Sequence, residues 1–280
     1  MTQQGWFEGV SPDDSDSAID RIRDGDSDAP DHWPKRAVEA GFSADEETYY
    51  EQLRSVTIEA TRQAVKTREQ ADDSQLVHAV RAMDDCDRTA NELAERTAEW
   101  AGTLFDDVDP RLEAVRSLAE KTPQTPAEEQ VLSLASQVDS LATEAESLRS
   151  FIEQRAPATA PNLDAMAGPV LAARLIALAG GLEQLAKKPS GTVQVLGAED
   201  ALFAHLAGRA SSPKHGIIFT HEYVRGTPRE NRGSAARALA GKLSIAARID
   251  HYSGELKPEI HEELDERIET IRARTAGGDK

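Results

Sequence analysis

The 280-residue chain has a single cysteine, Cys86, and this scarcity excludes a disulfide framework and a cysteine-rich zinc site. No apolar run approaches 18 residues, and the first twenty residues carry five acidic side chains. The sequence therefore predicts neither a membrane span nor a signal peptide. We expect a cytoplasmic protein that makes no contact with a membrane.

Sequence motifs typical of catalysis are also missing. There is no G-x-G-x-x-G and no GK[ST] element that would cradle a phosphate. The pairs His221-Glu222 and His261-Glu262 lack the second histidine of a zinc-protease helix, and the seven histidines show no ligand spacing. Cys86 lies between acidic neighbours, which disfavour a thiolate, so we interpret it as a packing residue. We expect no enzyme, no cofactor and no metal.

The charge is strongly acidic but unevenly distributed. Fifty Asp and Glu against 32 Lys and Arg give a net charge of −18, and the basic residues are 23 Arg and only 9 Lys. This composition is typical of proteins that stay hydrated at high salt, and it predicts a halophilic source. Taken whole, the acidity argues against nucleic acid as a partner. However, residues 157–255 carry a net charge of +3 and the remainder −21. This shift predicts domain boundaries near Ala156 and near 254–258.

Residues 1–42 have the composition of an irregular segment. They are rich in Asp, Ser, Gly and Pro, and Pro12, Pro30 and Pro34 interrupt every hydrophobic period. We predict an acidic N-terminal arm that is poorly structured or folds only with a partner. A capping box at Ser43 and Glu46 then predicts the start of a helical region.

The region 43–156 is predicted to be a helical hairpin. Hydrophobic spacing of three and four residues indicates a long helix to about residue 105, with one break near 72–73. After a turn and a short helix over 112–118, Thr125, Pro126 and Glu128 provide the capping signature of a second long helix. Its apolar seam consists of Val131, Leu134, Val138, Leu141, Ala145, Leu148 and Ile152. This a/d spacing is typical of a coiled coil. We favour antiparallel pairing within one chain, although spacing alone leaves a seam between two chains open.

From Pro157 the pattern changes to short helices separated by glycine and proline. Helices are predicted over residues 169–179, 182–188, from within 197–200 to 207 and about 228–252, with one more charged helix after Pro258. The last long one would begin at the cap signature of Thr227, Pro228 and Glu230. Only 192–196 and 216–219 have strand-like composition, so the fold class is mainly α.

The cationic residues of this third region form the candidate binding site. Lys214, His215, Arg225, Arg229 and Arg232 gather in one loop. Arg237 and Lys242 continue the series onto the following helix, and Lys187 and Lys188 end an earlier one. Such a loop and helix face would suit a phosphate backbone, and a merely solvated face is the alternative.

Several motifs in this order and spacing resemble the Nop domain of the scaffold proteins of archaeal box C/D ribonucleoproteins. They are Ala160-Pro-Asn-Leu163, Ala173-Arg-Leu-Ile176, Leu185-Ala-Lys187, Val195-Leu-Gly-Ala-Glu199, Ala201-Leu-Phe203, Ser212-Pro-Lys-His-Gly216, Ala235-Ala-Arg-Ala-Leu-Ala240 and Ala246-Ala-Arg-Ile-Asp250. Upstream, Ala82-Met-Asp-Asp85 and Asn91-Glu-Leu-Ala-Glu-Arg96 resemble the helix before that family's coiled coil. The resemblance covers about residues 74–255.

The resemblance implies a non-catalytic scaffold with a helical hairpin over 43–156, an all-helical Nop domain over 157–255 and a charged C-terminal helix over 256–280. Its implied partners are a box C/D guide RNA, a kink-turn-binding core protein, the methyltransferase fibrillarin and a second copy through the coiled coil. Such a particle performs RNA-guided 2′-O-ribose methylation of rRNA or tRNA. By position, the implied RNA-facing residues are Lys187, Gln194, Gly197, Ala198, Glu199, Lys214, His215, Arg232, Arg237 and Lys242.

The chain departs from the family pattern in three respects. Asp200 stands where the family's G-A-E-K motif has lysine, the coiled coil is short, and the region before Leu76 is too short for the family's mixed α/β fibrillarin-binding domain. Because Asp200 and the acidic arm both disfavour RNA, the alternative is a helical protein–protein scaffold of the same family that has lost direct RNA contact.

Overall fold

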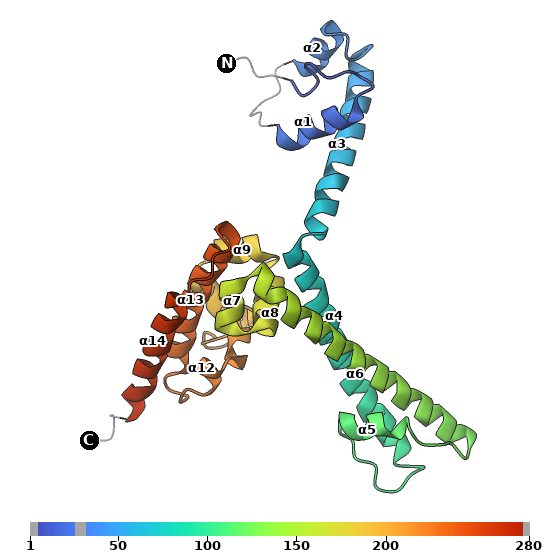
Figure 1. The fold of residues 1–280 in the computed structure, drawn as a ribbon, viewed down its shortest axis with the longest axis vertical. Helices are drawn as coiled ribbons and strands as arrows, with labels where there is room; N and C mark the ends of the chain where they lie inside the picture. Colours follow the sequence, from blue (N-terminus) through green and yellow to red (C-terminus); the bar gives the residue numbers. More distant parts are fainter. Residues whose placement is uncertain (1–4, 26–31, 277–280) are drawn as a thin grey trace. The chain divides into compact units, whose positions relative to one another are not determined.

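A computed structural model describes residues 5–25 and 32–276, and these residues contain helices and no β-strand. The mainly α fold class is therefore confirmed. The chain divides into two compact units, Met1–Ala71 and Asp72–Lys280, each of which is described by itself (Figure 1). The strand-like runs 192–196 and 216–219 fall mostly in a short helix and a 3-10 turn.

The first unit is built around an aromatic cluster. It contains α1 (Ser15–Asp24), α2 (Trp33–Glu39) and α3 (Glu46–Glu69). Trp6, Phe7, Phe42 and Tyr49 are buried together, and the Trp6 indole donates a hydrogen bond of 3.0 Å to the Tyr49 hydroxyl. The prediction of a poorly structured arm is thus wrong for the described part of residues 1–42. Aromatic side chains from distant parts of the sequence pack against α3 here. The hydrophobic spacing within any one segment does not reveal such a core.

The start of α3 also differs from the prediction. Asp45 is the N-cap, and its carboxylate accepts a hydrogen bond of 2.7 Å from the Thr48 amide. The predicted capping box at Ser43 and Glu46 is wrong, because the Ser43 hydroxyl donates to the Gln52 side chain instead. The predicted break is present, since α3 ends at Glu69 and the next helix begins at Asp72.

The second unit begins with a helical hairpin. α4 (Asp72–Ala101) and α6 (Pro126–Thr159) lie side by side, and α5 (Leu112–Leu118) packs near their closed end (Figure 1). Thr125 caps α6 as predicted, with its hydroxyl accepting from the Glu128 amide at 3.2 Å. α6 passes through Pro157 and ends at Thr159, so the predicted boundary near Ala156 lies inside its last turn.

The buried face of α6 differs partly from the predicted seam. Val131, Val138 and Ile152 are fully buried within the chain. Leu134, Leu141 and Leu148 are only half-buried, because much of the centre of the interface is formed by alanines. Ala145 of the predicted seam is buried, and so are Ala135, Ala142 and Ala156, which the prediction did not include. Small residues at these positions let the two helices approach closely, and the hairpin pairs within one chain. A seam between two chains stays a prediction.

A helical domain completes the second unit. Its elements are α7 (Pro161–Ala167), α8 (Pro169–Ala179), α9 (Leu182–Lys187), α10 (Ser190–Val195), α11 (Glu199–Leu206), the 3-10 turn η1 (Ile217–Thr220), α12 (Glu222–Arg225), α13 (Arg232–Tyr252) and α14 (Glu259–Ala276). α13 contacts α7, α9, α10, α12 and α14 and is the central helix. Among the described residues, no single helix is long and apolar enough to cross a membrane; α7 and α8, bent by 119°, pass that test only as a pair.

Two boundaries of the helical domain differ from the predictions. α13 begins at Arg232 rather than at Thr227, because the Thr227 hydroxyl donates to the Tyr223 carbonyl at 2.7 Å and caps no helix. α14 buries Leu264, Ile268 and Ile271 in the same core as α13. The region after Pro258 is therefore part of this domain rather than a separate tail.

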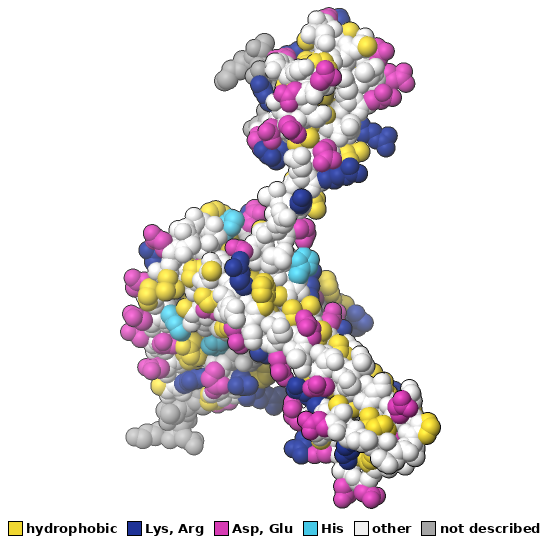
Figure 2. All heavy atoms as spheres, turned by 45° about the vertical axis from the view of Figure 1, so that its right-hand side comes forward, with side chains coloured by type: hydrophobic (Ala, Val, Ile, Leu, Met, Phe, Trp, Pro, Cys, Tyr) yellow, Lys and Arg dark blue, Asp and Glu magenta, His cyan; other side chains and the backbone are white. Residues whose placement is uncertain are grey.

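Polar contacts join the hairpin to the helical domain within the second unit. Arg174 on α8 binds the Asp84 carboxylate on α4 with two guanidinium nitrogens. Asp73 accepts a hydrogen bond of 2.9 Å from the Leu182 amide at the start of α9. Figure 2 shows Asp and Glu side chains interspersed with Lys and Arg along the hairpin, whereas α13 carries only one carboxylate, which is buried.

Candidate nucleic-acid interface

Residues 194–196 and 216–217 are joined by backbone hydrogen bonds, and together they form the base of the candidate site. The Gly216 amide donates to the Gln194 carbonyl at 2.9 Å, and the Ile217 amide donates to the Leu196 carbonyl at 2.7 Å. The Gln194 side-chain amide donates to the Lys214 carbonyl at 2.7 Å. A Cβ on Gly216 would lie 1.9 Å from the Leu196 carbonyl oxygen, so this close approach requires glycine. Gln194 and Lys214 are thereby held next to each other.

His215, Phe219 and Arg232 form a stack beside this base. The His215 and Phe219 rings lie 4.6 Å apart at an angle of 21°, and the Arg232 guanidinium lies 5.4 Å from the centre of the Phe219 ring. Burial, followed by the positive charge of Arg232, lowers the pKa of His215 below its usual value. His215 is therefore neutral at pH 7 and presents a flat hydrogen-bonding ring.

The Arg232 side chain also has a structural role. Its Nε donates to the Thr227 carbonyl at 3.0 Å, and one terminal nitrogen donates to the Arg225 carbonyl at 3.3 Å. These bonds hold the turn that leads into α13. Arg225 itself pairs with Glu222 at 3.2 Å and is exposed, while Arg229 is exposed in the turn.

An open groove runs beside the joined segments, between α10 and the first turns of α13. Lys214 and Arg237 are its cationic residues and Glu230 is its acidic one. The other lining residues are Gly191, Gln194, Val195, Leu202, Ser212, Pro213, Gly233 and Ser234. Hydroxyl, amide and cationic groups converging on an open surface suit a phosphate backbone better than a small apolar ligand.

The Gly197-Ala198-Glu199 loop lies next to this base. Gly197 has a φ of +79°, which favours glycine, and its amide donates to the Glu199 carboxylate at 2.9 Å. Glu199 thus folds back on its own loop. α11 then begins with Glu199 and Asp200 and buries none of its residues. Phe203 is 64% exposed, so the α11 surface combines carboxylates with a bare apolar side chain.

Two predicted site residues lie apart from the others. Lys242 forms an ion pair with Glu263 on α14 and is turned away from the groove. Lys187 pairs with Glu183 at 2.5 Å and lies near Tyr252 at the far end of α13. At 1.5 Å rise per residue, Tyr252 is about 22 Å along the helix axis from Arg237. The structure therefore brings together Gln194, Lys214, His215, Arg232 and Arg237, with 197–199 beside them.

The aromatic member of the stack, Phe219, was missed from the sequence. It stands four residues after His215 within a short apolar run that has the composition of a buried strand. The available signal was that spacing, because an aromatic one helical turn beyond a histidine can stack on it. Ser212 and Ser234 were missed as well, since isolated serines carry no pattern.

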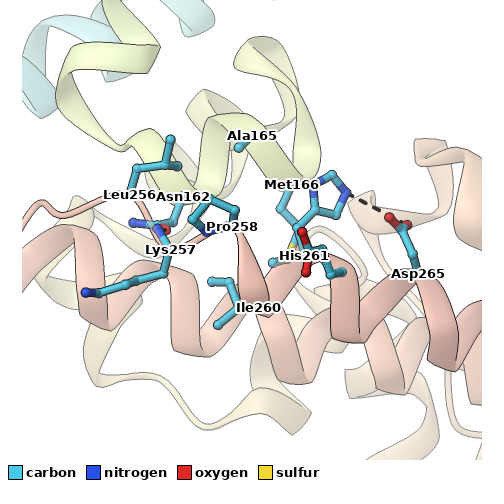
Figure 3. A pocket seen from close by; sticks show the side chains of 10 residues that line it. Asn162, Ala165, Met166, Leu256, Lys257, Pro258, Ile260, His261 and Asp265 are labelled. Carbon is cyan, nitrogen blue, oxygen red and sulfur yellow. Dashed lines mark hydrogen bonds and ion pairs between the residues drawn. The ribbon is translucent and has the colours of Figure 1, made fainter.

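A second hollow between α7 and α14 has a different character (Figure 3). Apolar side chains, among them Met166, Leu256 and Ile260, form much of its wall. His261 and Asp265 lie 4.0 Å apart at one end of it. Lys257 is the only Lys or Arg among its lining residues, so it lacks the cationic character of the groove. Across the described residues, no group of three or more His, Cys, Asp or Glu could hold a metal ion.

The fold and the site define a class of protein: a mainly helical protein in which a long hairpin leads into a helical domain with a polar, cationic surface groove. The chain belongs to the Nop family, whose model is described as "snoRNA binding domain, fibrillarin" and matches residues 51–270. The predicted resemblance is confirmed at the level of the family.

Relatives and a solved structure support this assignment. The chain is 33% identical over 277 residues to an uncharacterized NOP5 family protein of Methanocaldococcus jannaschii, covering 86% of this chain and 67% of the relative. It is 35% identical over 218 residues to nucleolar protein 58 of Schizosaccharomyces pombe, covering 65% of this chain and 43% of that protein. The chain thus spans about two thirds of the first relative and less than half of the second.

Among solved structures, the chain resembles one described as the crystal structure of a fibrillarin/Nop5p complex. The TM-score is 0.54 at 25% sequence identity, and the match covers 96% of this chain and 98% of the other. The similarity therefore extends over both units, including the short first one.

Proposed function

We propose that the chain is a non-catalytic scaffold of a box C/D ribonucleoprotein. In this role it binds kink-turn RNA together with a small core protein and positions fibrillarin for RNA-guided 2′-O-ribose methylation of rRNA or tRNA. Support comes from the family description and from the fibrillarin/Nop5p likeness. We further propose that the particle works at high salt, as the acidic, lysine-poor composition suggests.

The observation that carries the proposal is the joint placement of Gln194, Lys214 and Arg237 around one open groove, with His215 following Lys214 directly in the chain. Lys214 and Arg237 are exposed and available to phosphates. The His215 ring is held in place by its stack on Phe219, burial lowers its pKa, and Gln194 is held by its bond to the Lys214 carbonyl. Because counterion release weakens at high salt, shape and hydrogen bonding have to supply much of the affinity. A rigid polar groove meets that requirement.

The test is a filter-binding assay with kink-turn RNA, with and without the core protein, in molar KCl. Lys214→Glu combined with Arg237→Glu reverses two exposed charges at the groove and should abolish binding. Arg267→Glu reverses one exposed charge on α14 and serves as the control. Arg232 is less suitable, since its variant would also lose the bonds that hold the turn before α13. Absence of RNA retention by the wild type under both conditions would refute the proposal.

We place fibrillarin on the first unit as part of the same proposal. The match to the Nop5p chain extends over 98% of that chain, which includes the region corresponding to the first unit here. α3 exposes Tyr50, Ile58 and Val65, which are 58%, 41% and 54% accessible. A pull-down of fibrillarin by the full chain and by its Tyr50→Ala variant tests this placement; equal recovery would move the contact elsewhere.

The alternative function is a helical protein–protein scaffold of the same family without direct RNA contact. The observation in its favour is that Glu199 and Asp200 place two carboxylates in the exposed first turn of α11. Asp200→Lys distinguishes the two functions. If the chain binds RNA, this variant should bind kink-turn RNA more tightly, whereas a chain without RNA contact would show no change.

A further inference from the structure

The solvent-facing side of α13 forms one continuous stripe that begins at the groove. Its exposed or half-exposed positions recur at steps of three and four residues, as one face of a helix requires. They are Ser234, Arg237, Gly241, Ile245, Arg248 and Tyr252. At 1.5 Å per residue the stripe extends about 27 Å, which is longer than the groove that the predicted site residues occupy.

This stripe carries no carboxylate in a chain that has 50 of them. The single acidic residue of α13, Asp250, is on the opposite face, where it accepts hydrogen bonds of 2.9 Å from the amides of Asn162 and Leu163. The cations along the stripe are Arg237 and Arg248. Along a helix in so acidic a protein, this distribution singles out one face for a negatively charged partner.

The neighbouring helices extend the cationic character on one side of the stripe. α9 ends at Lys187, which pairs with Glu183 on the same helix and lies next to the last turns of α13, and the Arg248 Nε donates to the Ala186 carbonyl at 3.1 Å. Lys188 follows directly, and α10 exposes Gly191 and Thr192 beside the groove. On the other side lies the acidic α14, where Lys242 pairs with Glu263. A polyanion would therefore lie toward α9 and α10.

The far end of the stripe has an exposed aromatic ring. Tyr252 is 74% exposed, and its ring lies 4.7 Å from that of His251 in an edge arrangement. One face of such a ring is a platform for an unpaired nucleobase, since stacking on tyrosine is a general mode of single-strand recognition. An acidic peptide would use the lysines but would not require the aromatic platform.

We propose that α13 carries a second RNA contact, in which a strand leaving the kink-turn lies along Arg237, Arg248 and Lys187–Lys188 and stacks one unpaired base on Tyr252. The occupant is RNA rather than an acidic protein, because the charged track ends in an exposed tyrosine. This inference rests on the proposed function, since the strand reaches α13 only when the groove holds the kink-turn.

The test compares two RNAs in the presence of the core protein. One is a kink-turn with short flanks, and the other carries single-stranded extensions of about ten nucleotides, enough to reach the end of α13 at about 3.4 Å per nucleotide. The extension should tighten wild-type binding by about tenfold, in line with one stacked base and a few phosphate contacts. Tyr252→Ala should lose most of that gain, and so should Lys187→Gln combined with Lys188→Gln.

All three variants, including the control Arg267→Glu on α14, should bind the short RNA as the wild type does. Arg267→Glu should also keep the gain from the extension. A gain that survives both Tyr252→Ala and the double lysine variant, or no gain in a wild type that does bind the short RNA, would overturn the second contact alone. A wild type that binds neither RNA would refute the proposed function itself. A Tyr252→Ala variant that instead loses core-protein recruitment to the short RNA would assign the ring to a protein contact and overturn the inference.

Discussion

Replacing Gly216 by alanine should destabilise the base of the candidate site, whereas an exposed charge reversal should leave the fold intact. The new Cβ would lie 1.9 Å from the Leu196 carbonyl oxygen and 2.7 Å from the Val195 carbonyl carbon, and both are backbone atoms that cannot rotate aside. The segment must therefore move, which breaks the hydrogen bonds from the Gly216 and Ile217 amides. Overpacking of this kind costs about 1–3 kcal/mol, and each lost backbone bond about 1 kcal/mol.

Allowing for partial relaxation, we expect Gly216→Ala to lower the free energy of unfolding by about 2–4 kcal/mol. Urea unfolding in molar KCl, followed by circular dichroism, measures this change. RNA binding should weaken as well, because Lys214 and His215 immediately precede the displaced residue. Gly191→Ala is the matched control: a Cβ there meets no atom within 4 Å, so it should stabilise α10 by about 0.5–1 kcal/mol. A loss below about 0.5 kcal/mol for Gly216→Ala would refute the packing account.

Two further predictions concern stability. Burial lowers the pKa of His221, whose Nδ1 accepts from the Tyr223 amide at 3.1 Å while Nε2 lies 3.1 Å from the Met166 carbonyl. The folded state thus favours neutral histidine, and this contribution to the free energy of unfolding is lost as pH falls below about 6.5. His221→Asn keeps an N-cap that does not titrate, so the free energy of unfolding should depend less on pH between 7.5 and 5.5. An unchanged pH dependence would contradict this. Ile152→Ala should lower the free energy of unfolding by about 2–4 kcal/mol because that side chain is fully buried. Leu134→Ala should lower it by only about 1 kcal/mol because Leu134 is half-buried. Equal losses would mean that Leu134 is buried as the sequence predicted.

Local signals in the sequence predicted much of the second unit. α8 has the predicted bounds, Pro169–Ala179, because proline starts it and two glycines end it. Thr125 caps α6 because no competing acceptor takes its hydroxyl. The same signature at Thr227 failed because the Tyr223 carbonyl accepts that hydroxyl. Capping motifs are therefore informative only where the tertiary structure leaves them free.

The remaining differences arise from long-range contacts. The first unit folds around Trp6 and Tyr49, which are 43 residues apart, and no window of the sequence shows that pairing. Lys242 was predicted to face RNA, but Glu263 on α14 takes its charge. Phe219 was not predicted from the sequence, and the structure places its ring against His215 and within 5.4 Å of the Arg232 guanidinium. Residue type and spacing identified most of the candidate site, and the partner helices decided which cations remain available.

The most direct test of the account is the affinity of the full chain for kink-turn RNA in the presence of the core protein in molar KCl. The wild type and Arg267→Glu are expected to bind, and Lys214→Glu combined with Arg237→Glu is expected not to bind, while all three keep the same helix content. Undiminished binding by the double variant would contradict the assignment of the groove as the RNA site.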